Sequence, residues 1–319
     1  MKALTSTDKA TVRFKGQELK INLLKVSDQK LIITGYYPKI CQLKDEWYQD
    51  LNDAESFINT LIANRIRADV FTFIERPPTC TPNYSYYVEW DNVAAINLTN
   101  YDYWWQKQIN SKTRALVRRA QKNGVYVKLV TFNDDLLKGI EEIYNEAPMR
   151  QGKPFWHYKK GLEYLKRVHE TFLDKSDFLG AYYNEELIGF VKLVYAGETA
   201  NTMHIISKNS HRDKSVTNAL VAKAVERSCE KGARYLVYDK YDYELGGSPS
   251  LLLFKRNNGF SKLEFPRYYI PLTKKGKIAL KIGLHHGLIP ILPKELVKYM
   301  LRIRNNLRIK WYKLKYETE

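Results

Sequence analysis

The residues best able to do chemistry lie between positions 238 and 255. Asp239 and Tyr241 belong to the run Tyr238-Asp239-Lys240-Tyr241-Asp242-Tyr243, which closes a predicted strand, and Lys255 lies near the end of a short predicted helix. A carboxylate can take up a proton, a tyrosine hydroxyl can donate one, and an ammonium group can stabilise negative charge that develops in a transition state. Asp239, Tyr241 and Lys255 are therefore candidate catalytic residues, and the alternative for each is a structural or surface role.

A second group of polar and aromatic side chains lies in residues 146–158. Glu146 is a further candidate base, and Arg150 could recognise phosphate or carboxylate through paired hydrogen bonds. The rings of Trp156 and Tyr158 could stack on a sugar. These four residues are candidates for substrate binding.

A basic loop at residues 208–215 joins a predicted strand to a predicted helix. The N-terminus of a helix offers unpaired backbone N–H groups and a partial positive charge, which suit a phosphate group. Arg212 and Lys214 could add charge, and Ser207 and Ser215 flank the loop. We expect these four residues to bind a phosphorylated cofactor, against the alternative of a solvated surface loop.

Other mechanisms have little support in the sequence. It has no Gly-x-Ser-x-Gly turn, no phosphate-binding P-loop and no cysteine recognisably paired with histidine, so no covalent enzyme intermediate is expected. Cys41, Cys80 and Cys229 are far apart and form no Cys-x-x-Cys motif. Neither a disulfide framework nor a zinc knot is indicated, and a reducing compartment fits best.

The histidines do not indicate a metal site. His169 falls on a predicted helix and His204 on a predicted strand, and we interpret both as core or surface histidines. The pair His285-His286 has no further ligand nearby in the sequence. No metal is expected.

Hydrophobic periodicity places these residues on an alternating series of strands and helices. Up to about residue 100 the pattern predicts strands at 31–37, 70–75 and 93–98 and a helix near 53–67. Beyond it, the pattern predicts strands at 125–130, 178–183, 187–195, 201–207, 235–239 and 262–270 and helices at 100–123, 136–147, 161–173, 215–231 and 249–257. Asn-Gly or Gly residues follow three of these helices, as is typical of helix ends.

Length and composition limit the class of protein. A chain of 319 residues with 44% hydrophobic side chains is long enough for two domains with sizeable cores, so a small disulfide-stapled module and bulk disorder are excluded. The N-terminus has no apolar signal segment, and no apolar run approaches the roughly 20 residues that span a bilayer. We therefore expect neither export nor a membrane span.

The net charge of +17 is concentrated near the C-terminus. Residues 272–319 carry nine lysines and three arginines against three glutamates. Within them, apolar residues recur at helical spacing (Leu296, Met300, Ile303, Leu307 and Trp311), which predicts a basic amphipathic helix. Such a helix could lie on an anionic membrane or pack its apolar stripe on the protein core, and nucleic acid is a third candidate partner.

Two motifs in this order of elements resemble the Fem-type and BioF2-like branch of the GNAT acyltransferase superfamily. The first is Lys112-Thr113-Arg114-Ala115-Leu116-Val117-Arg118-Arg119-Ala120-Gln121-Lys122-Asn123-Gly124-Val125, similar to the branch's arginine-rich helix ending in Gly-Val. The second, Phe254-Lys255-Arg256-Asn257-Asn258-Gly259-Phe260, is similar to its Phe-Lys…Gly-Phe signature. The resemblance covers residues 90 to 270 well and the first 90 loosely.

The resemblance implies a mixed α/β tandem GNAT-like fold. It implies a degenerate N-terminal half at 1–99, a complete GNAT domain at 100–272 and a basic tail at 273–319, with the acceptor in the cleft between the halves. It also implies that two neighbouring strands past residue 200 part to admit the donor.

In relatives a lysine at the position of Lys255 faces the donor or the developing oxyanion, and Phe254 joins the cofactor-binding set. The loop at 208–215 departs from the superfamily's Arg/Gln-x-x-Gly-x-Gly/Ala pattern because it has no glycine.

The implied activity is transfer of an acyl group from acyl-CoA to an amino group of a cell-envelope or polysaccharide precursor. The alternative donor is aminoacyl-tRNA, as in Fem-type enzymes, and the positive charge would suit tRNA. A third reading is a non-catalytic protein on a GNAT scaffold that binds membrane or RNA. The expected location is cytoplasmic, with peripheral binding to the inner face of the membrane through residues 273–319.

Overall fold

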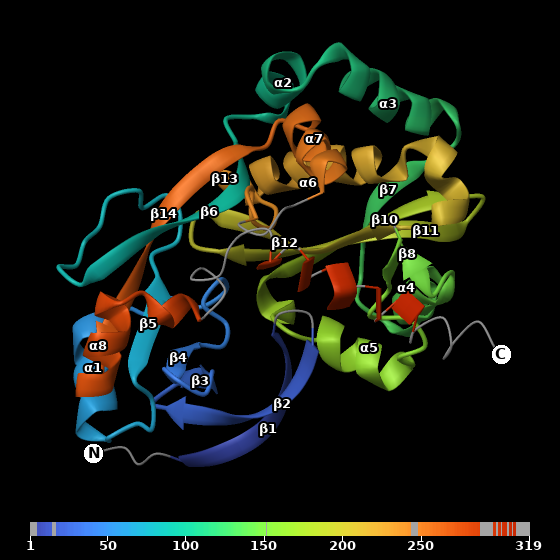
Figure 1. Ribbon diagram of the computed structural model, residues 1–319. Helices are drawn as coiled ribbons and strands as arrows, with labels where there is room; N and C mark the ends of the chain where they lie inside the picture. The colour runs from blue at the N-terminus through green and yellow to red at the C-terminus, as the bar shows by residue number, and fades with distance from the viewer. Residues whose placement is uncertain are drawn as a thin grey trace. The chain divides into compact units, whose positions relative to one another are not determined.

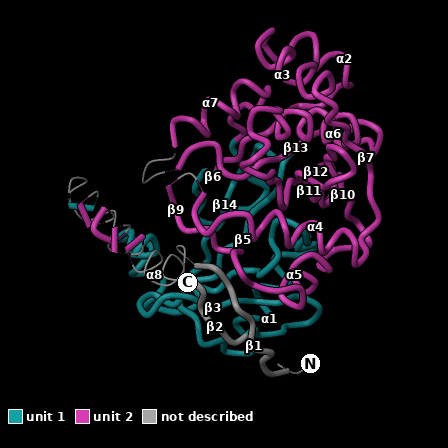
Figure 2. Tube along the Cα trace, turned by 90° about the vertical axis from the view of Figure 1, so that its right-hand side faces the viewer, with its two compact units in different colours: residues 1–91, 264–297 teal, residues 92–263, 298–319 magenta. Residues whose placement is uncertain are grey.

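The computed structural model describes residues 5–14, 17–150, 152–243 and 248–287, and beyond them 296–297, 299–300, 302–304, 306–307 and 309–310. The chain divides into two compact units (Figure 2): unit 1 comprises residues 1–91 and 264–297, and unit 2 comprises residues 92–263 and 298–319. This division differs from the expected boundaries after residues 99 and 272. The strands β6 (Tyr87–Asn97) and β14 (Ser261–Pro271) each run through a boundary, and the second half of β14 pairs with a strand of unit 1.

Unit 1 is built on a sheet in the order β1-β2-β3-β4-β5-β14. Its first five strands are β1 (Thr5–Phe14), β2 (Gln17–Val26), β3 (Gln29–Thr34), β4 (Ile40–Leu43) and β5 (Val70–Ile74). β4 and β5 are parallel, and the other neighbours in this sheet whose register is described are antiparallel. The strands β1, β2 and β4 were not predicted. β5 is buried at every position, which matches its uninterrupted apolar sequence.

The helix α1 (Ala54–Ala63) covers this sheet and closes the core of unit 1. The side chain of Asp53 caps its first turn by accepting a hydrogen bond from Ser56 N. The helix buries Phe57, Ile58 and Leu61 against strand residues that include Phe71 and Tyr268. After β14 the chain forms α8 (Lys274–Lys281) and the short 3₁₀ turn η4 (Leu284–His286).

Unit 2 contains a sheet in the order β6-β13-β12-β11-β10-β7. Its other strands are β7 (Tyr126–Val130), β10 (Ser176–Tyr183), β11 (Glu186–Ala196), β12 (Thr199–Ser207) and β13 (Tyr235–Val237). β12 and β13 are parallel, whereas β7, β10, β11 and β12 form an antiparallel series. A separate small hairpin joins β8 (Met149–Arg150) and β9 (Lys153–Pro154).

Helices cover both faces of this sheet (Figure 1). α3 (Ser111–Lys122) and α6 (Val216–Glu230) lie on one face, and α4 (Asp134–Asn145) and α5 (Leu162–His169) lie on the other. Each face has its own apolar core, one centred on α6 and one on α4. The helix α7 (Pro249–Asn257) has the predicted bounds.

The predicted helix at 100–123 is not continuous. It is divided into α2 (Tyr101–Tyr103), a π-helical turn η1 (Trp104–Gln108) and α3, because Ile109 is extended and Asn110 caps α3 by accepting a hydrogen bond from Thr113 N. The indole of Trp104 is fully buried and donates to Asn258 O. A tertiary contact thus overrides a continuous helical pattern.

The predicted C-terminal amphipathic helix falls partly outside the described residues, Trp311 included. Its described positions are helical, and four residues of the predicted stripe are exposed: Leu296 (44%), Met300 (44%), Ile303 (41%) and Leu307 (63%). The neighbouring Val297, which is not part of the predicted stripe, is buried with 4% exposed. Among the described residues, no helix has both the length and the apolar composition of a membrane span.

A mostly buried ion cluster in unit 1 gives a test of stability. The guanidinium of Arg267 pairs with Glu46 at 2.7 Å and with Asp91 at 3.2 Å. Removing one partner from such a cluster leaves uncompensated charge, so Arg267→Ala should cost about 3 kcal/mol of unfolding free energy in urea titration. The control Arg234→Ala removes an exposed pair at 3.5 Å and should cost less than about 1 kcal/mol. Equal losses in the two variants would show that the buried cluster stabilises the fold no more than a surface ion pair does.

Candidate functional site

The strands β12 and β13 pair over three residues and then separate. Thr199, Ala200 and Asn201 pair with Tyr235, Leu236 and Val237, and the last link is a hydrogen bond from Thr202 Oγ1 to Val237 O at 2.9 Å. The structure therefore has the expected pair of parted strands past residue 200.

Backbone hydrogen bonds explain why the strands part. After β13 the chain stays beside β6: Tyr238 N donates to Ala94 O at 2.8 Å, and Ala94 N donates to Asp239 O at 2.9 Å. β12 instead remains paired with β11 as far as Ser207. Each strand follows a different neighbour, so an opening forms between them.

A cavity of about 250 Å³ lies at this opening. Its walls come from β12, from the residues after β13, from α4 and from the segment after β9, and the lining residues are Tyr144, Phe155, His157, Thr202, Met203, His204, Ile205, Ile206, Tyr238 and Asp239. A mostly apolar wall with a few titratable groups is typical of a small-molecule site. The titratable groups of this wall include Asp239 and His204.

His204 is part of a cluster of histidines on this side of unit 2. Its ring centroid lies 4.7 Å from that of His169 and 6.0 Å from that of His157. Burial, the two neighbouring imidazoles and the ammonium of Lys192 together hold the pKa of His204 well below its usual value. His204 is therefore neutral at pH 7. Its ring can accept or donate a hydrogen bond, whereas the same environment disfavours its protonation. The sequence pattern indicated only a core or surface histidine at this position.

Asp239 is the predicted catalytic residue that reaches the cavity wall. Its carboxylate accepts hydrogen bonds from the Tyr243 hydroxyl at 2.7 Å and from Lys240 N at 2.7 Å. Burial and the Asp239 carboxylate raise the pKa of Tyr243, so this hydroxyl stays protonated and keeps donating to Asp239.

Lys255 is fully buried and does not line the cavity. Its ammonium donates to Lys240 O and lies 5.5 Å from the ring centroid of Tyr238 and 4.9 Å from that of Tyr243. Burial lowers its pKa, against the charges of Asp239 and Asp242. These contacts hold Lys255 against the loop that carries Asp239. The contact with the reacting carbonyl that the resemblance implied stays a prediction.

Two other predicted residues also lie away from the cavity. The hydroxyl of Tyr241 accepts a hydrogen bond from Arg256 Nε at 3.1 Å. Phe254 packs against the apolar core of unit 2. Neither is among the lining residues, so a proton-donor role for Tyr241 and a cofactor contact for Phe254 are not supported by these positions.

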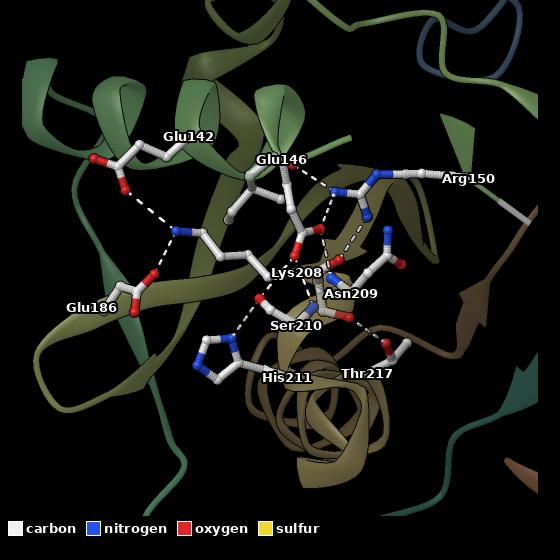
Figure 3. A network of polar contacts seen from close by, with 11 residues as sticks. Glu142, Glu146, Arg150, Glu186, Lys208, Asn209, Ser210, His211 and Thr217 are labelled. Carbon is white, nitrogen blue, oxygen red and sulfur yellow. Dashed lines mark hydrogen bonds and ion pairs between the residues drawn. The ribbon is translucent and has the colours of Figure 1, made fainter. Parts of the chain in front are cut away.

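Glu146 and Arg150 form an internal network at the end of β12 (Figure 3). The Glu146 carboxylate accepts hydrogen bonds from Asn209 N at 2.6 Å and from Ser210 N and Oγ at 2.8 Å, and it pairs with Arg150 at 3.1 Å. Arg150 also donates to Ser207 O at 2.7 Å and to Ile143 O at 2.5 Å. The two side chains fasten α4 to the loop after β12, so their partners here are internal rather than those of a bound acceptor.

The four residues that were expected to bind phosphate lie in or beside the rest of this loop. Within η3 (Asn209–Lys214), Arg212 is exposed, and Lys214 lies 3.3 Å from Asp213. Ser215 has a φ of 57°, the left-handed conformation that favours glycine. The Ser207 hydroxyl contacts Thr217 Oγ1 at 3.1 Å. Phosphate binding by these residues stays a prediction.

The aromatic residues of the predicted acceptor loop are placed differently from the expectation. Phe155 and His157 line the cavity, whereas Trp156 and Tyr158 do not. Lys160 Nζ lies 4.5 Å from the Trp156 ring centroid, and Lys159 Nζ lies 5.8 Å from that of Tyr158. A sugar-stacking role for these two rings stays a prediction.

Comparisons with known proteins confirm the predicted fold. No protein-family model matches the sequence, and a search of the curated proteins found no significant match. Among solved structures, FemX is similar with a TM-score of 0.56 at 12% identity, over 88% of this chain and 90% of that one. The C-terminal domain of a putative lysylphosphatidylglycerol synthetase from Agrobacterium fabrum has a TM-score of 0.53 at 11% identity, over 83% and 88% of the two chains. A protein from Bacillus licheniformis named L-PGS has a TM-score of 0.52 at 13% identity, over 78% of this chain and 83% of that one. The chain therefore has the mixed α/β, Fem-type GNAT-like fold that its two motifs indicated.

The network around Glu146 predicts a pH dependence of stability. Burial alone would raise the pKa of Glu146, but hydrogen bonds from Ser210 and Asn209 and the charge of Arg150 lower it below its usual 4.5. A lowered pKa in the folded state adds stability that is present above the unfolded value and is lost as the pH falls through the folded value.

Glu146→Gln should therefore cost about 2 kcal/mol of unfolding free energy at pH 7 and progressively less below about pH 4.5. Urea titrations from pH 7 to pH 3 measure this difference. The control Glu142→Gln removes a carboxylate that is 64% exposed and should cost less than about 1 kcal/mol at every pH. A Glu146→Gln loss that did not change with pH would argue against the assignment.

Proposed function

We propose that the chain is an acyltransferase that moves an acyl group from an activated carboxyl donor to an acceptor amine in the cavity where β12 and β13 part. The observation that carries the proposal is this opening, because its cavity of about 250 Å³ is lined by a carboxylate that follows β13 and by a neutral imidazole from β12. In the reaction the amine nitrogen bonds to the donor carbonyl carbon, the thioester or ester bond breaks, the thiol or hydroxyl of the donor leaves, and the nitrogen loses a proton. A similar fold in FemX and in a putative lysylphosphatidylglycerol synthetase supports a transferase of the cell envelope.

The side chains on the cavity wall can supply the proton transfer. An amine attacks only when it is neutral, so a group in the site must accept its proton directly or through water. We assign this step to Asp239, whose orientation is held by Tyr243 and by the backbone of residue 240. His204, on β12, lines the same cavity and can accept a hydrogen bond from the incoming amine, and Lys255 holds the loop that carries Asp239.

Acyl-CoA is the first candidate donor. Its pyrophosphate would lie at the start of α6, where Ser215 has a left-handed backbone and Arg212 is exposed to meet a phosphate. The acceptor would be an amino group of a cell-envelope or polysaccharide precursor.

Aminoacyl-tRNA is the second candidate donor, and a specific observation favours it. Glu146 already holds two backbone N–H groups of the loop after β12, which leaves fewer donors there for a pyrophosphate. The net charge of +17 would suit a long polyanion. The name of the putative lysylphosphatidylglycerol synthetase also indicates transfer of a lysyl group.

We further propose that the described part of the C-terminal helix lies on an anionic membrane. It exposes Met300, Ile303 and Leu307 together with Arg302 and Arg304. Exposed apolar side chains among basic ones are typical of helices that lie in the headgroup region. A membrane-bound acceptor and a cytoplasmic, peripheral location would follow from this placement.

The catalytic assignment is tested with the purified chain, a polyamine or amino-sugar acceptor, and each donor in turn. Asp239→Asn should lower kcat with the active donor by about 10²–10⁴-fold, and His204→Gln should lower it less. The control Asp242→Asn alters an exposed carboxylate of the same loop, paired with Lys262 at 3.3 Å, and should leave kcat unchanged. Turnover with acyl-CoA alone selects the first donor, and turnover with aminoacyl-tRNA alone selects the second. No turnover with either donor would leave a non-catalytic binding protein as the better description. Full activity of Asp239→Asn would overturn the assignment of Asp239 as the proton acceptor.

Membrane binding is tested by sedimentation with vesicles of phosphatidylglycerol and phosphatidylcholine. Replacing Arg302 and Arg304 by Gln should weaken binding to the anionic vesicles about 30-fold, at about 1 kcal/mol for each charge. The control replaces Arg118 and Arg119 on α3, which are also exposed, by Gln and should leave binding unchanged. Equal weakening in both double variants would mean that net charge, and not the C-terminal helix, drives the binding.

A further inference from the structure

Three side chains with metal-binding atoms meet in unit 1, far from the cavity residues in sequence. Glu89 lies on β6, and His285 and His286 lie in η4. His285 Nε2 is 2.8 Å and His286 Nε2 is 3.0 Å from Glu89 Oε1, and one ligand atom from each residue lies within 4.8 Å of the others. The sequence did not reveal this group because Glu89 precedes His285 by 196 positions.

The turn that carries the histidines brings both rings to one side. Successive side chains of a 3₁₀ turn point about 120° apart, since the turn has about three residues. The His285 and His286 ring centroids are nevertheless only 4.0 Å apart, and both Nε2 atoms face the same carboxylate. Gly283 and Gly287 bracket the turn with φ values of 72° and 78°, which glycine adopts at little cost.

The elements on either side of this group are held in place. α8, which leads into the turn, approaches β5 so closely that a Cβ on Gly276 would lie 1.9 Å from Asp69 O. Thr273 caps α8 by accepting from Gly276 N and also donates to Asp69. The hydroxyl of Tyr87 donates to Glu89 Oε1 at 3.1 Å and so orients the carboxylate from outside the group.

The three potential ligand atoms, and their exposure to solvent, match the requirements of Zn²⁺ and similar divalent ions. Two imidazole nitrogens and one carboxylate oxygen are the ligands of many three-residue zinc sites, in which water takes the fourth position. Zn–N and Zn–O bonds of about 2.0–2.2 Å place tetrahedral ligand atoms about 3.4 Å apart, so small side-chain shifts would suffice. The His285 side chain is 1% exposed, whereas His286 is 37% and Glu89 is 24% exposed. The group is thus closed on one side and open to solvent on the other.

We propose that Glu89, His285 and His286 bind a divalent ion of the zinc class, with a solvent position open, and that the ion fastens the turn after α8 to β6. The alternative is that two neutral imidazoles donate their Nε2–H groups to Glu89 without any ion. The two cases predict different affinities for Zn²⁺, different visible spectra after addition of Co²⁺ and different responses of the thermal midpoint to Zn²⁺.

The test uses the full chain after treatment with a chelator. Calorimetric titration with ZnCl₂ should give one site per chain, and Co²⁺ should give the intense visible absorption of a tetrahedral site. The thermal midpoint should rise with added Zn²⁺, because an ion that binds the folded state stabilises it. No stoichiometric Zn²⁺ binding, or a Co²⁺ spectrum of hexahydrated ion alone, would overturn the proposal.

Variants connect the binding to these residues. Tyr87→Phe keeps all three ligands and should weaken Zn²⁺ binding about 10-fold. Glu89→Gln and His286→Asn each change a ligand. They should weaken binding by more than about 100-fold, which is the most that loss of an outer contact costs. The control His211→Asn changes an imidazole on η3 in unit 2 and should leave the titration unchanged. Unchanged binding in Glu89→Gln would show that the ion is held elsewhere and would overturn the assignment.

Discussion

The candidate site depends on one choice of backbone hydrogen bonds, made where β13 ends. Tyr238 and Asp239 bond to Ala94 of β6, while β12 continues beside β11. Had residues 238 and 239 continued to pair with β12, the cavity would be closed and the Asp239 carboxylate would have no cavity wall to lie on. A single change of partner therefore creates the opening and also brings to it a carboxylate from one strand and an imidazole from the other.

Charge around this opening is controlled by burial and by internal pairing. Lys192 and Lys255 have no exposed surface, and each donates to main-chain carbonyl groups, which compensates part of the cost of removing an ammonium from water. The positive charge of Lys192 helps to keep His204 neutral. On the far side of β12, Glu146 supplies the negative charge that the loop's N–H groups attract. These hydrogen bonds hold the loop against the end of α4.

Unit 1 has a different distribution of polar groups. Its buried ion cluster joins β14 to residues 46 and 91, and a second polar group joins Glu89 to the turn after α8. Both groups tie the segment at 264–287 to residues that precede it by more than 170 positions. This segment follows the acyltransferase-like part of the chain in sequence, but hydrogen bonds and ion pairs make it part of the N-terminal unit.

The sequence by itself predicted the fold class and, apart from the hairpin β8-β9, the main helices and strands from β7 to β14, through local periodicity, helix ends and two motifs. Its resemblance to a known branch also implied the strand pair that parts, and Asp239 was among its candidate residues. Only the tertiary structure decided that Lys255 and Tyr241 lie behind the cavity wall, that Glu146 and Arg150 bind the protein's own loop, and that His204 faces the cavity. It also decided that Glu89 meets His285 and His286. The physical reason is that periodicity reports which face of an element is buried, whereas the partner of a polar side chain depends on contacts between segments far apart in the chain.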